Sequence, residues 1–224
     1  MRRKVLGIVL IVFALTSKAQ YYNDDASLWL NLAGTKELNA KTELQVSMQN
    51  RIGNNITQYN QGSVDVGLQY KVNKLFRISG DYMFRQSRRL DGSYSTRHRF
   101  YLNLFLRKKA GSFTFIYRNR TQLQLKDIYS SAEGSVPVFY NRNKLQVKYE
   151  LNKRIELYVS EEVYSPFYRF NAIGIDRSRS AVGMIYNLSK KSSIEGTFYY
   201  QQELYATRQL RRNFIYSLTY NFSF

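Results

Sequence analysis

Hydrophobic residues recur at every second position in run after run of this chain. Within residues 63–71, for example, Val64, Val66, Leu68 and Tyr70 alternate with polar residues and glycine. Successive side chains of a β-strand point to opposite faces, so this period of two predicts strands with one apolar and one polar face. The chain is therefore predicted to be all-β, because the same pattern returns in residues 76–85, 113–118, 144–151, 155–164, 194–203 and 213–224.

The length of these runs favours a membrane protein. Many are about ten residues or longer, whereas strands of soluble proteins centre on about 5–6 residues, and a strand tilted across a bilayer needs ~9–11. The predicted connections alternate between short turns and longer loops, as in outer-membrane barrels. The longer loops are predicted near residues 52–61, 88–96, 127–141, 167–176 and 204–210. We expect a transmembrane, antiparallel, up-and-down β-barrel with short periplasmic turns and longer extracellular loops. The last run ends at Phe224, which predicts recognition of this strand by the barrel-assembly machinery.

The number of strands is harder to predict from the sequence than the fold class. Ten strands follow from Thr42 onward, and residues 26–34 resemble a further strand of uncertain placement. An eleventh full strand would begin outside the cell, which does not suit the N-terminal end of an exported chain. Residues 26–34 therefore pair only partly, lie in the lumen, or belong to a twelve-strand barrel. We predict ten strands, with twelve as the alternative.

The N-terminal segment has the features of a secretory signal peptide. Arg2, Arg3 and Lys4 precede an apolar stretch, residues 5–15, and small residues stand at positions 17 and 19. The stretch is shorter than the ~20 residues of a membrane-spanning helix. We predict that residues 1–19 are removed and that residues 20–224 form one barrel domain in the bacterial outer membrane.

Composition excludes several kinds of site. The chain has no Cys and one His, which excludes a thiolate metal site, a cysteine nucleophile and a multi-histidine metal site. No cofactor is expected. The formal net charge of +18 and the 20 Tyr would suit nucleic acid, but export argues against that partner.

Charged residues on the polar face are expected to point into the lumen. An Arg or Lys facing lipid at mid-bilayer costs ~2–4 kcal/mol. The simplest interpretation is an internal network of ion pairs, and the functional one is a narrow pore that favours anions. The predicted lumen network comprises Arg77, Asp81, Arg85, Arg99, Arg118, Arg120, Glu156, Glu162, Glu195 and Glu203.

Residues near the long loops are expected at the membrane boundary. Arginines there form either a solvated rim or contacts with phosphates of the outer-leaflet glycolipid, because guanidinium groups match phosphate geometry. The candidates for glycolipid contact are Arg88, Arg89, Arg142, Arg211 and Arg212. Aromatic residues near strand ends are predicted to form an interfacial girdle: Trp29, Tyr94, Tyr101, Tyr140, Tyr168, Tyr186 and Tyr205.

Short motifs along the mature chain resemble the domain-of-unknown-function 2490 family of exported bacterial proteins. The resemblance implies an outer-membrane-type barrel, and it implies no activity and no catalytic residue. The motifs are Ser27-Leu28-Trp29-Leu30, Gln49-Asn50-Arg51, Tyr117-Arg118-Asn119-Arg120, Ser160-Glu161-Glu162-Val163-Tyr164, Arg177-Ser178-Arg179, Tyr199-Tyr200-Gln201-Gln202-Glu203 and the final aromatic strand.

These features favour a non-enzymatic outer-membrane barrel, acting as a narrow pore or as an envelope-interaction protein. One alternative is a lipid-modifying enzyme using His98, with Ser93 and Ser95 nearby in sequence. His98 shares the apolar face, however, and would point to lipid. The other alternative is a soluble periplasmic barrel that binds an apolar ligand, since alternation alone does not say which face meets water.

Overall fold

The computed structural model describes residues 22–126, 138–167, 174–204 and 210–224. The predicted signal peptide lies outside these ranges. No helix long and apolar enough to cross a membrane occurs in the described part of the chain.

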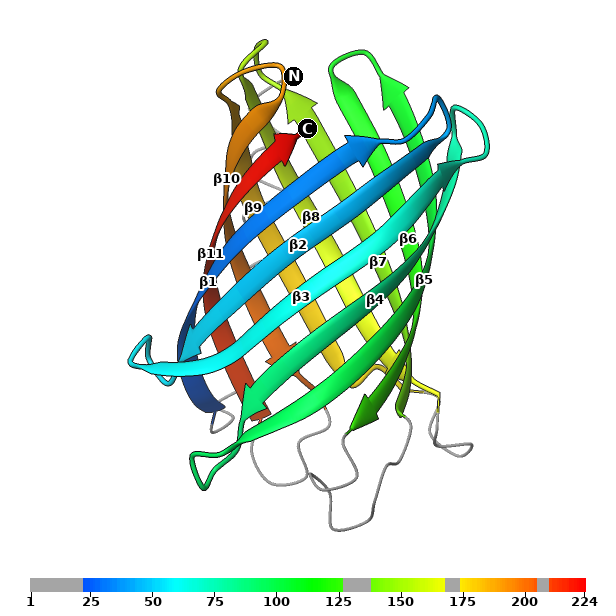
Figure 1. Ribbon diagram of the computed structural model, residues 1–224. Coiled ribbons are helices and arrows are strands. Elements are labelled where there is room, and N and C mark those ends of the chain that lie inside the picture. The colour runs from blue at the N-terminus through cyan, green and yellow to red at the C-terminus, as the bar shows by residue number, and fades with distance from the viewer. Residues whose placement is uncertain (1–21, 127–137, 168–173, 205–209) are drawn as a thin grey trace.

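The described residues form one closed barrel of eleven strands (Figure 1). Consecutive strands pair antiparallel from β1 to β11, as the alternating pattern predicts. The strands are β1 (Tyr22–Glu37), β2 (Thr42–Gly53), β3 (Gln58–Lys71), β4 (Phe76–Arg88), β5 (Tyr94–Ala110), β6 (Phe113–Lys126), β7 (Val138–Glu150), β8 (Ile155–Pro166), β9 (Arg177–Asn187), β10 (Ser192–Glu203) and β11 (Leu210–Ser223).

The predictions of ten strands and of twelve are both wrong. The segment of uncertain placement, residues 26–34, is the middle of β1, a full strand that pairs antiparallel with β2 and parallel with β11. Leu30, for example, stands opposite Asn50 on one side and Leu218 on the other. An up-and-down barrel needs an even number of strands only if its last pair is antiparallel. The parallel seam removes that requirement, and it places the start of β1 at the end opposite the chain's last residue.

The connections sort to the two ends of the barrel. Short turns at residues 38–41, 72–75, 111–112, 151–154 and 188–191 lie at one end, together with Phe224 (Figure 1). The connections at the other end include two predicted to be long, around residues 52–61 and 88–96. Both are short, residues 54–57 and 89–93, because the flanking strands extend further than their sequence pattern suggested. We call these ends the short-turn end and the long-loop end.

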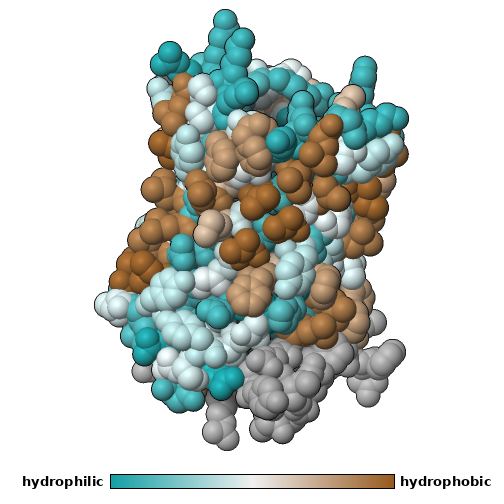
Figure 2. Space-filling view, in the orientation of Figure 1, coloured by the Kyte–Doolittle hydropathy of each residue, from teal (hydrophilic) through white to brown (hydrophobic). Residues whose placement is uncertain are grey.

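The apolar faces of the strands point outward. Exposed positions include Leu68, Leu102 and Val182, and hydrophobic side chains gather across the middle of the face seen in Figure 2. Polar residues fill the interior, where Ser79 and Asn103 are almost fully buried. A soluble barrel holding an apolar ligand would need the reverse arrangement. The wall therefore suits lipid, and a closed sheet leaves no unpaired strand edge in it.

Candidate functional site

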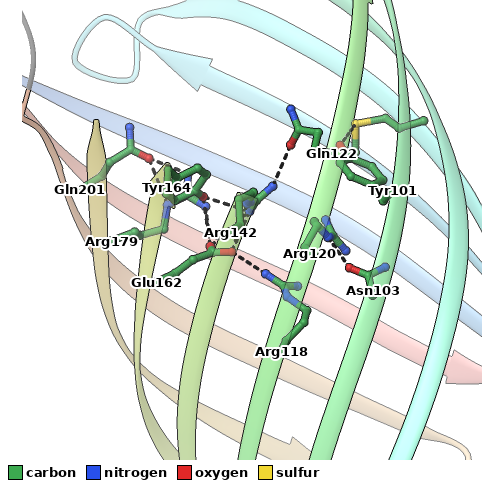
Figure 3. Close-up of polar contacts among 11 residues, drawn as sticks. Tyr101, Asn103, Arg118, Arg120, Gln122, Arg142, Glu162, Tyr164, Arg179 and Gln201 are labelled. Carbon is green, nitrogen blue, oxygen red and sulfur yellow. Dashed lines mark hydrogen bonds and ion pairs between the residues drawn. The ribbon is translucent and has the colours of Figure 1, made fainter. Parts of the chain in front are cut away.

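Glu162 of β8 lies inside the barrel, among three arginines from neighbouring strands (Figure 3). Arg118 Nη2 lies 2.5 Å from Glu162 Oε1, and Arg142 donates to both carboxylate oxygens, from Nε at 3.1 Å and from Nη2 at 3.2 Å. Arg179 Nη1 lies 3.8 Å away, and the Tyr164 hydroxyl donates to Oε2 at 3.0 Å. The Glu162 side chain is 5% exposed. We call these residues the Glu162 hub, which combines three positive charges with one negative charge.

Aromatic rings face the same guanidinium groups. The guanidinium carbon of Arg142 lies 4.4 Å from the ring centre of Tyr164. Trp29 of β1 contacts Arg51, at 3.7 Å from its ring centre, and the hub residue Arg179, at 5.0 Å. Such stacking favours a cation over a ring face. The prediction that Trp29 belongs to an interfacial girdle is therefore wrong, because the inward parity of β1 places it in the lumen.

A second network lies across β4, β5 and β6. Asn103 donates to Ser79 Oγ at 2.8 Å and also contacts Asp81, while it accepts a hydrogen bond from Arg120 Nε at 2.5 Å. Arg120 in turn stacks on Tyr101 at 4.3 Å. Tyr101 is 4% exposed, so it too lies in the lumen and not in the predicted girdle. The partners of Arg120 in this network, the amide of Asn103 and the ring of Tyr101, are neutral, whereas Arg118 pairs with the carboxylate of Glu162.

Buried side chains narrow the middle of the lumen, and we call this section, with the Glu162 hub and the Asn103 network, the waist. Ile215 is completely buried, and Trp29, Tyr158 and Tyr164 are each less than a tenth exposed. An eight-stranded barrel is just filled by its side chains, and eleven strands leave only a little more room. Any passage through this waist is therefore narrow.

A cavity of about 760 Å³ opens between the waist and the long-loop end. Of its described lining residues, Asp25 is the one carboxylate. Trp29, Tyr140 and Tyr164 contribute aromatic rings, so Tyr140 also faces inward and not outward to a girdle. We call this cavity the vestibule, and the arginines that line it are Arg51, Arg85, Arg88, Arg89, Arg97, Arg99, Arg142, Arg177 and Arg179.

Comparisons with known proteins agree with this architecture. Residues 26–212 match the sequence profile of a family described as "Protein of unknown function (DUF2490)". The chain belongs to the DUF2490 family. A search of curated proteins found no match for this DUF2490 chain.

Solved structures similar to this DUF2490 barrel include a porin and two autotransporter domains. The NanC porin aligns with a TM-score of 0.50 and 15% identity, over 79% of this chain and 86% of that chain. The β-domain of the Bordetella autotransporter BrkA gives 0.47 and 9%, over 80% and 82%. The translocator domain of the autotransporter NalP from Neisseria meningitidis gives 0.45 and 11%, over 78% and 71%. The NanC likeness shows a shared outer-membrane-type barrel fold.

The predicted lumen residues lie on the inward faces of the DUF2490 barrel, but in separate groups. Arg118 and Glu162 meet in the hub, and Asp81 and Arg120 meet through Asn103. Glu203 pairs with Arg177 at 3.6 Å, Glu156 lies 3.9 Å from Lys148, and Glu195 contacts Tyr158. Arg85 and Arg99 line the vestibule. Arg77 shares the inward face of β4 with Ser79, toward the short-turn end.

The predicted glycolipid-contact arginines have different positions. The prediction for Arg142 is wrong. Arg142 is on the inward face of β7, where its guanidinium pairs with Glu162, and its side chain is 11% exposed. Arg88 and Arg89 line the vestibule mouth, and Arg211 is exposed at the start of β11. Arg212 points outward and pairs with Asp24 of β1 at 2.6 Å across the parallel seam.

Sequence reasoning missed several arginines of this site, and His98 stands apart from it. Arg97 stands two residues before the predicted lumen residue Arg99 on β5, a signal that could have placed it inside, whereas β2 and β9, which carry Arg51 and Arg179, held no predicted lumen residue. His98 faces outward, and its Nδ1 lies 2.7 Å from the hydroxyl of Tyr82. Ser93 Oγ instead donates to Asp91, and Ser95 Oγ donates to the Ser87 carbonyl. Within the described residues, His98 thus has a tyrosine and not a serine as its hydrogen-bond partner. Tyr168 and Tyr205 lie outside the described residues.

Proposed function

We propose that this protein is a non-enzymatic outer-membrane barrel that forms a narrow, anion-favouring passage. The observation that carries the proposal is the vestibule, a cavity of about 760 Å³ whose described lining residues include nine arginines and one carboxylate. A concave surface with one sign of charge concentrates counter-ions, because the surrounding wall has a low dielectric constant. Rings of Arg or Lys select anions in pores in the same way.

The waist supplies the second part of the proposal. Arg118 and Arg120 on β6 lie where buried side chains narrow the lumen, and only Arg118 of the two contacts Glu162 directly. An ion that passes the Glu162 hub meets more positive than negative charge, because the hub combines three arginines with one carboxylate. The narrowness favours small ions and a low conductance.

The membrane orientation follows the usual asymmetry of such barrels. Short turns would face the periplasm and long loops the outside, so the vestibule would open to the exterior. Export after removal of residues 1–19, and assembly through the final strand, belong to the same proposal. Arg88, Arg89 and Arg211 remain candidates for contact with glycolipid phosphates, because they lie at the long-loop end.

The test is ion selectivity in planar lipid bilayers. The mature protein, residues 20–224, is first checked as a folded barrel by its heat-dependent gel shift. It is then inserted into a bilayer that separates two KCl concentrations, and the reversal potential is measured. We expect chloride to permeate better than potassium. The double variant Arg118→Gln/Arg120→Gln should lose much of that preference. The control Arg154→Gln, in an exposed short turn, should keep it. A folded barrel without conductance, or with equal permeability for both ions, would refute the proposal.

A further inference from the structure

We infer that one wall of the vestibule is a saturable binding site for a small oxyanion with two or more negative charges, of the polycarboxylate or polyphosphate class. The site comprises Arg85, Arg97 and Arg99, from β4 and β5, and we call it the β4–β5 wall. This inference deepens the proposed function, because it names the class of anion that the vestibule would take. It does not require that the anion passes through the waist.

The first support is the packing of like charges on this wall. Arg85 and Arg97 stand directly opposite each other on paired strands, and Arg99 follows on the same face of β5. All three line the cavity. Like charges directly opposite each other in a sheet destabilise it. A cluster of this kind is therefore expected where an external anion supplies the missing charge.

The second support is the contrast with the arginines of β7 and β9. Arg142 and Arg179 neutralise part of their charge on Glu162, and Arg177 pairs with Glu203. Among the described residues, none of the ion pairs includes Arg85, Arg97 or Arg99. Two of the three have neutral hydrogen-bond partners: Arg85 Nε donates to Ser87 Oγ at 2.8 Å, and Arg99 Nε donates to Gln124 Oε1 at 2.6 Å.

The third support is a pair of unused donors beside the wall. Arg97 Nε and Gln61 Nε2 are buried, line the same cavity, and have no hydrogen-bond partner within the described ranges. Buried polar groups normally have partners, and each exception calls for an explanation such as an absent ligand. Asp25, the one carboxylate among the described lining residues, already accepts a hydrogen bond from the backbone N–H of Asn55 at 2.8 Å.

The chemistry of the donors defines the ligand class. A guanidinium presents parallel N–H groups that match the paired oxygens of a carboxylate or phosphate. Three such groups from adjacent strands suit an anion with several oxygens and more than one charge, while a halide offers a single acceptor atom. The cavity of about 760 Å³ is within the ~300–1,000 Å³ range of small-molecule pockets.

The chain contains its own reporter for the test. Trp29 is the one tryptophan of the sequence, and it lines the vestibule against Arg51. The mature protein in detergent micelles is titrated with citrate and with pyrophosphate, at constant ionic strength, while tryptophan fluorescence is recorded. Acetate and chloride serve as monovalent controls. Isothermal titration calorimetry on the same samples detects binding that leaves the fluorescence unchanged.

We expect saturable binding of citrate or pyrophosphate, weakened about tenfold or more in Arg97→Gln/Arg99→Gln, because the variant loses the charge-assisted hydrogen bonds of two guanidinium groups. Arg97→Lys/Arg99→Lys keeps the charge but loses the paired donors, so its affinity should lie between those of the wild type and the glutamine variant. Arg154→Gln should bind like the wild type. Each variant is checked for folding by its heat-dependent gel shift.

Several results would overturn the inference: no saturable binding by either method, equal responses to acetate and citrate, or an unchanged affinity in the folded glutamine variant. The pore proposal fails separately. A barrel that binds citrate through these arginines but conducts no ions would support the site and refute the passage. A chloride-selective barrel that binds neither probe would do the opposite.

Discussion

Replacing Glu162 by glutamine tests whether the lumen is held together by its central charge. The substitution keeps the shape of the side chain and removes the negative charge that Arg118, Arg142 and Arg179 share. Each ion pair amounts to about 4 kcal/mol of gross attraction at a separation of about 4 Å and an effective dielectric constant of about 20. Most of this is offset by desolvation, and breaking a buried pair typically costs about 3–5 kcal/mol. We expect Glu162→Gln to lower the free energy of unfolding by that amount.

The assay is urea unfolding of the barrel in detergent micelles, with the slope of the transition compared between variants so that a change in midpoint reports stability. Glu161→Gln is the matched control. Glu161 is the neighbouring residue on the outward face, where it accepts a hydrogen bond from Ser180 and lies in an exposed environment. Its replacement should change stability by about 1 kcal/mol or less. Equal effects of the two substitutions, or a stable Glu162→Gln barrel, would refute the argument that the hub is buried and charge-coupled.

Two further predictions concern packing and closure. Gly183→Val should lower the free energy of unfolding by about 1–3 kcal/mol, because a Cβ at Gly183 would lie within 2.6 Å of the Tyr158 ring. The control is Gly196→Val, since a Cβ at Gly196 meets nothing within 4 Å. Equal urea midpoints for the two variants would contradict the packing. Leu30→Cys/Leu218→Cys should form a disulfide across the parallel seam of this cysteine-free chain, detected as a gel shift reversed by reductant, because the two positions face each other in register. The pair Leu30→Cys/Phe214→Cys, four residues out of register, should not, and cross-linking of the second pair alone would disprove the seam.

Much of the architecture follows from the sequence alone. Alternation with period two determines which side chains share a face, and the high cost of charge in lipid determines which face points inward. That is why Arg118, Glu162 and Arg85 could be placed in the lumen before any strand was paired. The alternation of side chains between the two faces is set by the backbone of each strand. It is therefore the same whatever the order of the strands around the barrel.

The strand count and the ion-pair partners depend on how the sheet closes, so only the tertiary structure shows them. Whether β1 pairs with β11, and in which direction, depends on how the whole sheet curls, so the count of eleven was not available from local pattern. Parity alone would also have put Arg142 and Trp29 inside, but their position near strand ends suggested a rim and a girdle. Which arginines find a carboxylate is likewise non-local: Glu162 pairs with arginines from three other strands, while none of the ion pairs among the described residues includes Arg85, Arg97 or Arg99. The ion pairs inside a barrel form between side chains of different strands, and these side chains come together only when the sheet closes.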